Sequence, residues 1–367
     1  MKVIISGGGT GGHIFPAIAI ANALKKIDGQ TEILFVGAEG RMEMEKIPAA
    51  GYKIEGLWIS GLQRRLTIDN LSFPFKVISS IMKSKKIIRS FKPDVAIGTG
   101  GFASGPLIYA AAGMKIPTLI QEQNSFPGIT NKLLGKSVNK ICVAYEGMEK
   151  YFPIGKIIVT GNPVRQDILS IEEKTEEAFN YFSLNPKRKT VLFLGGSLGA
   201  QTINQSVASC MDILIKNKIQ IIWQTGKSYV NFATKATSHL SGEDNGVRVY
   251  GFISRMDFAY SCAHVVVSRA GAIALSELAI VKMPCILVPS PNVAEDHQTK
   301  NAMALTNNKA AILVKDIEAK KKLGAEIISL LNDTQGQNKL SENISKLAFP
   351  HAAEVIAKEA IKLSSRQ

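Results

Sequence analysis

Residues 3–16 read VIISGGGTGGHIFP, a short apolar segment followed by five glycines, one threonine and one histidine. A helical pattern follows over 17–26. This order predicts a strand, a glycine loop and a helix. Because glycine leaves backbone N–H groups uncovered, we expect the loop over 7–12 to admit a phosphate-bearing ligand.

His13 stands at the expected start of this first helix. The positive end of the helix dipole disfavours the imidazolium, so we expect a neutral ring that can accept a proton. A neutral histidine beside a phosphate-binding loop indicates chemistry on a phosphate-bearing substrate. The alternative is an ordinary tight turn in which the histidine only caps the helix.

The composition favours a two-domain globular protein with an anionic partner. The 367 residues are 46% hydrophobic and carry a formal charge of +14, which fits nucleic acid, a phosphorylated substrate or an acidic membrane surface. A generally basic proteome would also explain this charge. The four cysteines are widely spaced, which predicts buried free thiols in a reducing compartment. The N-terminus passes from one lysine and a short apolar run into the glycine loop, so we expect no signal peptide. We also expect no transmembrane helix, because no apolar run reaches about 18 residues.

Short apolar runs alternate with helical patterns along the whole chain, which predicts parallel sheets in α/β domains. The expected strands are 3–6, 33–36, 95–99, 118–121, 140–143, 157–160, 190–194, 219–224, 247–250, 265–268, 285–288 and 311–314. The order restarts at TVLFLGGSLGA near residue 190, so we predict two Rossmann-like domains whose parallel sheets face a deep cleft. The expected domains are 1–161 and 162–348, with the helical segment 349–367 packing back on the first.

Three glycine-rich turns follow expected strands, at 7–12, 98–106 and 195–200. Together they predict a site for a phosphate or a nucleotide sugar. No acidic residue ends the expected strand 33–36, which argues against an NAD or FAD enzyme. The chain also lacks GxxxxGK[ST], which argues against a P-loop NTPase.

The segment SRAGAIALSELA, residues 268–279, places Arg269 at the expected start of a helix. Arg269 and the helix N-terminus can both meet a diphosphate. Glu277 lies further along this helix, where its carboxylate can accept both hydroxyls of a ribose. The alternative is a solvated glutamate on a helix surface.

Two further loops carry polar groups. In 289–302 the side chains of Asp296, His297, Gln298 and Asn301 crowd a helix start and suit sugar hydroxyls, or Asp296 simply caps that helix. In QEQN, residues 121–124, the polar groups of Glu122 and Asn124 either position a substrate or satisfy the loop backbone.

Residues 63–92 interleave apolar and basic side chains around a single acid, Asp69. Such a pattern suits an anionic bilayer surface, although a core helix with a basic outer face gives the same pattern. The candidate membrane patch comprises Phe73, Phe75, Lys76, Ile78, Ile81, Met82, Lys83, Lys85 and Lys86. No RNA- or DNA-binding motif is present, so we expect no nucleic-acid partner.

In order, GGGTGGHIFP, GTGGFASGP, TGNPVR, GGSLGA, SRAGAIALSE and DHQTKNA resemble the MurG family of glycosyltransferase family 28, along essentially the whole chain. The resemblance implies the GT-B fold, UDP-GlcNAc as donor and lipid I, undecaprenyl-pyrophosphoryl-MurNAc-pentapeptide, as acceptor. It implies an inverting β-1,4 transfer that requires no metal and no cofactor. It also implies a peripheral enzyme on the cytoplasmic face of the cell membrane, with cell-wall synthesis proteins as possible partners.

The resemblance also implies roles for matched positions. The donor-site residues are Thr10, Gly11, Gly12, Asn124, Arg165, Ser197, Phe252, Ile253, Met256, Arg269, Gly271, Ala272, Glu277 and Gln298. Asn124 also lies toward the acceptor and catalytic side, with Gly100, Gly101, Ser104 and Gly105. His13 is the first candidate for the general base and Glu122 the second. The family commonly has HEQN where this chain has QEQN, so a histidine at position 121 has no role here.

Two other classes remain open. One is a different GT-B enzyme, such as a glycolipid glycosyltransferase or a UDP-GlcNAc 2-epimerase. The other is a protein that binds a nucleotide sugar or nucleic acid without turnover.

Overall fold

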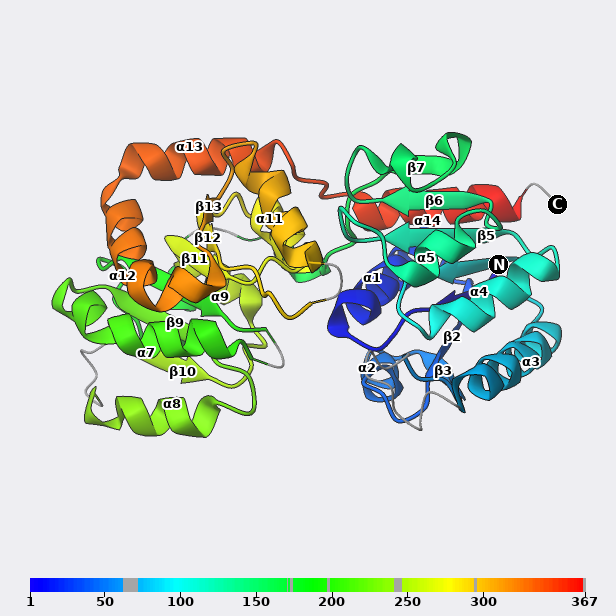
Figure 1. Ribbon diagram of the computed structural model, residues 1–367, viewed down its shortest axis with the longest axis horizontal. Helices are drawn as coiled ribbons and strands as arrows, with labels where there is room; N and C mark the ends of the chain where they lie inside the picture. The colour runs from blue at the N-terminus through cyan, green and yellow to red at the C-terminus, as the bar shows by residue number, and fades with distance from the viewer. Residues whose placement is uncertain are drawn as a thin grey trace. The chain divides into compact units, whose positions relative to one another are not determined.

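The computed structural model describes residues 1–61, 72–169, 171, 174–196, 199–240, 246–293 and 296–365. Its internal contacts divide the chain into two compact units (Figure 1). Unit 1 comprises residues 1–165 and 349–367, and unit 2 comprises residues 166–348.

Unit 1 contains a parallel sheet with the strand order β3-β2-β1-β4-β5-β6-β7. Its strands are β1 (Lys2–Ser6), β2 (Glu32–Ala38), β3 (Lys53–Leu57), β4 (Val95–Gly98), β5 (Thr118–Glu122), β6 (Lys140–Val143) and β7 (Ile157–Val159). Its helices are α1 (Gly11–Ile27), α2 (Glu43–Ala49), α3 (Phe73–Phe91), α4 (Ser104–Gly113), α5 (Ile129–Leu134) and α14 (Ala352–Ser364), with the 3₁₀ turns η2 (Met148–Lys150) and η3 (Ile154–Lys156).

Both faces of this sheet are covered, which explains why its strands are almost continuously apolar. Successive residues of β1 alternate between two cores: Val3 and Ile5 pack with α1 and α14, whereas Ile4 packs with α3 and α4. Ile356 of α14 is fully buried in the first of these cores. The C-terminal helix therefore belongs structurally to unit 1, where Figure 1 shows it in red.

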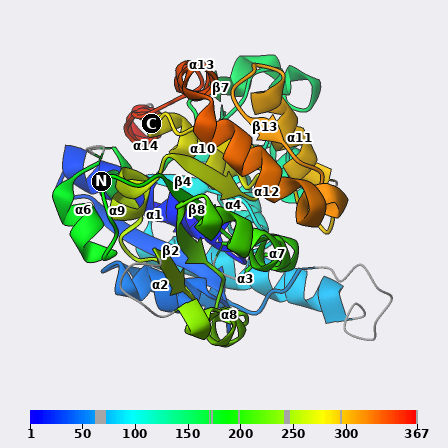
Figure 2. The ribbon, with the colours of Figure 1, turned by 90° about the vertical axis from the view of Figure 1, so that its left-hand side faces the viewer.

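Unit 2 contains a second parallel sheet with the order β10-β9-β8-β11-β12-β13. Its strands are β8 (Thr190–Leu194), β9 (Gln220–Gln224), β10 (Val247–Tyr250), β11 (Val265–Ser268), β12 (Cys285–Leu287) and β13 (Ile312–Leu313). Its helices are α6 (Glu176–Tyr181), α7 (Gln201–Lys216), α8 (Val230–Thr237), α9 (Met256–Cys262), α10 (Ala272–Ile280), α11 (His297–Thr306), α12 (Asp316–Asn332) and α13 (Thr334–Ser345), with the 3₁₀ turns η4 (Gln166–Ile168) and η5 (Ser238–Leu240). Helices α7 and α12 lie side by side over one face of the sheet (Figures 1 and 2).

The predicted fold class is confirmed, because each sheet has the Rossmann-type strand order with the reversal beside its first strand. Each expected strand is present with ends that differ by at most two residues. The prediction missed β3, and it was wrong about where the first helix begins: α1 starts at Gly11 and includes Pro16.

The four cysteines are free and buried, as predicted. Burial raises the pKa of Cys285 to about 12, so this thiol is held in its unreactive protonated form. Within the described residues, no helix is long and apolar enough to cross a membrane.

Candidate active site

In unit 1, the glycine loop after β1 lies against the loop after β4. Gly101 has a φ of +78°, and a Cβ on it would collide with the carbonyl oxygen of Gly8. Glycine is therefore required for the two loops to approach so closely. This contact lies at the point where the strand order reverses, which is where open α/β sheets bind their ligands.

His13 lies in the first turn of α1, as predicted. Its Nδ1 atom is 2.9 Å from the carbonyl oxygen of Thr99 and 3.1 Å from Oε1 of Gln123. A carbonyl oxygen can only accept, so Nδ1 carries the hydrogen, and the lone pair of the neutral ring is on Nε2. The hydroxyl of Thr99 donates to the carbonyl oxygen of His13 at 2.8 Å, which fastens the first turn of α1 to this loop.

Two of the predicted acceptor-side residues, Gly100 and Gly101, lie against His13. A Cβ on Gly100 would lie 2.9 Å from Nδ1 of His13. The hydroxyl of Ser104 donates to the carbonyl oxygen of Gly101 at 3.0 Å, at the start of α4. Gly105 follows in the first turn of the same helix. Among the predicted donor residues, Thr10 takes the N-cap position of α1, and its carbonyl oxygen accepts from the backbone N–H of His13 at 3.1 Å.

Glu43 supports the glycine loop of unit 1 and was not among the residues predicted from the sequence. Its side chain is fully buried at the start of α2. Oε2 accepts from the backbone N–H of Gly9 at 3.0 Å, and Oε1 accepts from that of Ala38 at 3.1 Å. Nothing in the sequence distinguishes Glu43 from Glu45, which is exposed on the same helix.

Glu122 is buried at the end of β5, and its carboxylate is occupied by the loop that follows. It accepts from the backbone N–H and the side-chain amide of Asn124 at 3.0 and 3.2 Å. It also accepts from the N–H of Gly128 at 3.1 Å and from the amide of Asn131 at 2.8 Å. These four bonds use the acceptor capacity of a carboxylate, so the geometry favours the alternative in which Glu122 orders the loop.

In unit 2, the predicted donor loop follows β8 at the corresponding reversal of strand order. Gly199 has a φ of +85°, and a Cβ on it would lie 2.6 Å from the carbonyl oxygen of Thr225. Gly271 takes the N-cap position of α10, and Ala272 is its first residue. Ser197 lies outside the described residues.

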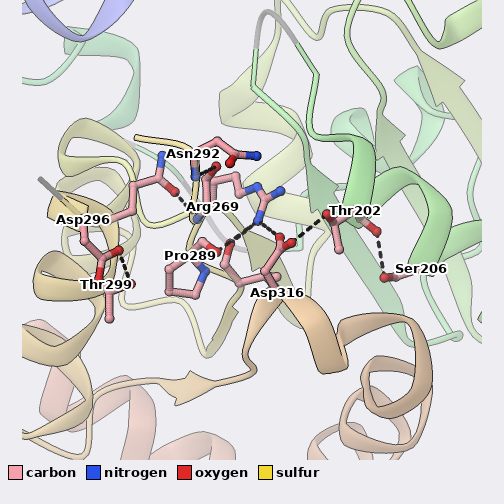
Figure 3. A network of polar contacts seen from close by, with 11 residues as sticks. Thr202, Ser206, Arg269, Pro289, Asn292, Asp296, Thr299 and Asp316 are labelled. Atoms are coloured by element: carbon pink, nitrogen blue, oxygen red, sulfur yellow. Dashed lines mark hydrogen bonds and ion pairs between the residues drawn. The ribbon is translucent and has the colours of Figure 1, made fainter. Parts of the chain in front are cut away.

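Arg269 lies at the centre of a polar network in unit 2 (Figure 3). Its Nη1 donates to the carbonyl oxygens of Val288 and Pro289 at 2.9 and 3.2 Å and pairs with Asp316. The other carboxylate oxygen of Asp316 accepts from the hydroxyl of Thr202 at 2.9 Å. Arg269 thus holds together the segment after β12 and the first residue of α12, and its contact with a diphosphate stays a prediction.

Two other predicted donor residues are fixed by local hydrogen bonds. Glu277 is buried on α10, and its Oε2 accepts from the hydroxyl of Tyr260 at 3.1 Å. Gln298 lies in the first turn of α11, where its Oε1 accepts from the backbone N–H of Ser290 at 2.8 Å. Asp296 takes the N-cap position of α11, but its carboxylate does not cap the helix backbone as the alternative reading expected. It accepts a hydrogen bond from the Thr299 hydroxyl at 2.6 Å.

The predicted uracil segment lies between β10 and α9. Phe252 is half exposed, whereas Ile253 is buried and its N–H donates to Oε1 of Gln224 at 3.1 Å. Met256 begins α9. Arg165 is the residue at which unit 1 gives way to unit 2.

The residues of the predicted membrane patch lie on α3, and only some of them share its exposed face. Phe75, Ile78 and Met82 are 70%, 58% and 66% exposed, and Lys85 and Lys86 are exposed beside them. Phe73, Lys76 and Ile81 are partly exposed, and Lys83 pairs with Glu39 at 3.0 Å. Helices α4 and α5 also carry exposed apolar side chains, namely Tyr109 on α4 and Ile129 and Leu133 on α5. The opposite face of α3 buries Ile87 and Ile88, so α3 also serves as a core helix; residues 62–71 lie outside the described part of the chain.

Each unit has a Rossmann-type sheet, with glycine loops and helix starts where the strand order reverses. Two such units in one chain are typical of GT-B glycosyltransferases. The Glycosyltransferase family 28 N-terminal domain matches residues 3–143, and the corresponding C-terminal domain matches residues 190–356. The chain belongs to glycosyltransferase family 28 and, within it, to the MurG family.

Full-length relatives support this membership. The chain is 55% identical over 366 residues to a protein of Flavobacterium psychrophilum, with 100% of this chain and 98% of that protein covered. It is 54% identical to a protein of Cytophaga hutchinsonii, with 99% and 96% covered. Both relatives bear the name UDP-N-acetylglucosamine–N-acetylmuramyl-(pentapeptide) pyrophosphoryl-undecaprenol N-acetylglucosamine transferase.

Solved structures agree with the fold. The crystal structure of Acinetobacter baumannii MurG superposes with a TM-score of 0.76 at 28% identity, covering 98% of this chain and 99% of that one. A UDP-GlcNAc 2-epimerase from Neisseria meningitidis superposes with a TM-score of 0.69 at 16% identity, covering 99% and 100%. At that identity the second likeness concerns the fold alone.

Proposed function

We propose that this protein transfers GlcNAc from UDP-GlcNAc to the C4 hydroxyl of MurNAc in lipid I and so produces lipid II. The observation that carries this proposal is the match along the entire chain to relatives named for this transfer. The geometry around His13 supports the same chemistry, because a sugar hydroxyl must lose its proton as it attacks.

In the proposed mechanism, Nε2 of His13 takes the proton of the acceptor C4 hydroxyl as its oxygen attacks the anomeric carbon of GlcNAc. The bond between that carbon and the UDP oxygen breaks on the opposite side, so the configuration inverts. The hydrogen bond from Nδ1 to the carbonyl of Thr99 holds the ring and stabilises the imidazolium that forms.

The leaving UDP develops negative charge on its diphosphate. The N-terminus of α10 offers backbone N–H groups for this charge, and the guanidinium of Arg269, which also pairs with Asp316, adds a positive charge. In the loop after β8, the N–H groups of Gly195 and Gly199 already donate to the carbonyl oxygens of Gln224 and Gly196. We assign the ribose to Glu277, the uracil to the Phe252–Met256 segment and the sugar to Gln298. The transfer is proposed to need no metal ion.

Membrane association is part of the proposal, because the acceptor named for the relatives carries an undecaprenol chain. The exposed apolar side chains of α3, α4 and α5 with the lysines of α3 suit a peripheral contact with an anionic cytoplasmic membrane face. The amphipathic pattern of α3 has its own core-packing explanation, so this surface needs a separate test.

The direct test is transfer of labelled GlcNAc from UDP-GlcNAc to a short-chain lipid I analogue, with and without EDTA. We expect labelled lipid II analogue in equal amounts under both conditions. A product that EDTA abolishes would overturn the metal-free mechanism. UDP binding without transfer to lipid I would overturn the acceptor assignment, and formation of UDP-N-acetylmannosamine would favour the epimerase alternative.

A further inference from the structure

Three buried amides connect His13 to the segment that leads out of unit 1. Gln121, Gln123 and Asn162 are each at most 2% exposed. The amide nitrogen of Gln123 donates to the carbonyl oxygen of Thr99 at 2.6 Å and to the side-chain oxygen of Gln121. The amide nitrogen of Gln121 donates to Oδ1 of Asn162 at 2.9 Å, and Nδ2 of Asn162 donates to the backbone oxygen of Gln123 at 3.1 Å.

Two backbone carbonyls fix the direction of this amide chain. Because the carbonyl oxygens of Thr99 and Gln123 can only accept, the amide nitrogens of Gln123 and Asn162 must face them. Oε1 of Gln123 therefore faces Nδ1 of His13, at 3.1 Å. Gln121 fits between them in one orientation only, with its oxygen toward Gln123 and its nitrogen toward Asn162.

We propose that Gln121 and Asn162 are positioning residues that act through Gln123 to hold His13 in the tautomer with its hydrogen on Nδ1. Reversing any one amide would set N–H against N–H or oxygen against oxygen in a buried site, which costs about 1–3 kcal/mol for each unsatisfied group. A reversed Gln123 would present its nitrogen to Nδ1, where this donor would oppose the carbonyl oxygen of Thr99 and mix the two tautomers of His13. The inference rests on the proposed function only in taking Nε2 as the base.

The donor and acceptor pattern at position 121 can be preserved or destroyed by substitution. Gln121→Met keeps the length of the side chain and removes both polar groups. Gln121→His restores one donor and one acceptor on a neutral ring, so it is the rescue variant.

Gln220 provides the matched control. It is as buried as Gln121 and also lies on an interior strand, in unit 2. Its amide donates to the carbonyl oxygen of Asn185 at 3.0 Å and to the hydroxyl of Thr190 at 3.1 Å. Gln220→Met therefore removes a comparable buried amide that has no connection to His13.

The experiment uses full-length protein with ¹⁵N-labelled histidine, whose ring-nitrogen spectra distinguish the tautomers. The His13 signals are assigned by their loss in His13→Asn. We expect Gln121→Met to mix the His13 tautomers and lower kcat roughly tenfold at an unchanged KM for UDP-GlcNAc, as a tenfold smaller competent fraction requires. Gln121→His should recover most of this loss, and Gln220→Met should leave both readouts unchanged.

An unchanged His13 spectrum in Gln121→Met, with kcat within twofold of the parent, would overturn the proposal. If that variant does not fold, Asn162→Leu tests the same chain, because it keeps the size of the side chain and removes both the acceptor for Gln121 and the donor to the backbone oxygen of Gln123. An unchanged tautomer there also overturns it. The nitrogen spectra report the tautomer of His13 whether or not the parent protein transfers GlcNAc. A failure of the proposed function is therefore distinguished from a failure of this inference.

Discussion

The carboxylate of Glu43 accepts a hydrogen bond from the backbone N–H of Gly9 at 3.0 Å, in the loop that leads into the helix of His13. Its other oxygen holds the N–H of Ala38 at the end of β2. One buried acid thus ties the end of β2 to the glycine loop between β1 and α1. The position of His13 depends on this support as well as on its own contacts.

Replacing Glu43 by alanine should therefore lower both stability and turnover. The change leaves two backbone N–H groups without their acceptors, at about 1–3 kcal/mol each where they stay buried. Thermal unfolding and the transfer rate measure the two effects. Glu45→Ala, on the exposed face of the same helix, should change stability by less than about 0.5 kcal/mol. Equal stability of the two variants would contradict the role of Glu43.

His13→Asn separates the base from the hydrogen bond. The asparagine amide can still donate to the carbonyl of Thr99, but it has no group that takes a proton. We expect kcat to fall by about 10²–10⁴ while affinity for UDP-GlcNAc, measured by calorimetry, stays within a few-fold. Near-full turnover in a folded His13→Asn protein would remove His13 from the role of base.

His264 should make unit 2 less stable in mild acid. Burial, with further contributions from Lys174 and Lys189, lowers the pKa of His264 to about 4. The unfolded chain binds a proton near pH 6.5 and the folded chain does not, so stability is lost as the pH falls from about 6.5 toward 4. Allowing for partial solvent screening, we expect a loss of about 1–2 kcal/mol between pH 7 and pH 5.

Urea unfolding at the two pH values checks this expectation. In His264→Asn the loss should shrink, because the asparagine oxygen can still accept from the N–H of Thr190, which lies 3.1 Å from Nδ1 of His264. The control is His351→Asn, whose side chain is exposed. If both variants keep the pH dependence of the parent, His264 is not its source.

Reversing two charges on α3 tests the proposed membrane surface. Lys85→Glu with Lys86→Glu should weaken binding to vesicles with anionic headgroups by at least about 30-fold, since each lysine contributes about 1 kcal/mol near such a surface. Cosedimentation at low and high salt measures the effect. Lys320→Glu with Lys321→Glu makes the same charge change on exposed positions of α12. Equal loss in both proteins would show that net charge, and not this surface, governs binding.

The C-terminal helix can be tested at two adjacent positions. Ile356 is fully buried against α1, whereas Val355 is partly exposed. Ile356→Ala should lower the unfolding free energy of unit 1 by about 2–5 kcal/mol, and Val355→Ala by much less. Hydrogen exchange assigns the effect to unit 1. An Ile356→Ala protein with unchanged protection in β1 would contradict this packing.

Local pattern in the sequence predicts most strands and the position of His13 at a helix start beside a glycine loop. It missed β3, because KIEGL, residues 53–57, is an edge strand with two charged residues and a glycine. Other features depend on tertiary contacts. Glu43 and Glu45 are alike in sequence, and only the fold buries one of them against Gly9 and Ala38. Gln121 and Asn162 meet because the sheet brings together segments 41 residues apart.

The packing of α14 has a consequence for synthesis on the ribosome. The face of the first sheet lined by Val3 and Ile5 shares its core with Ile356 and Ala360, and residues 166–348 are made in between. At 5–20 residues per second, part of this apolar face waits roughly 10–40 s for the helix that covers it. The second unit can fold while the first is still incomplete, so nascent chains would offer a binding surface to chaperones that the finished protein no longer has.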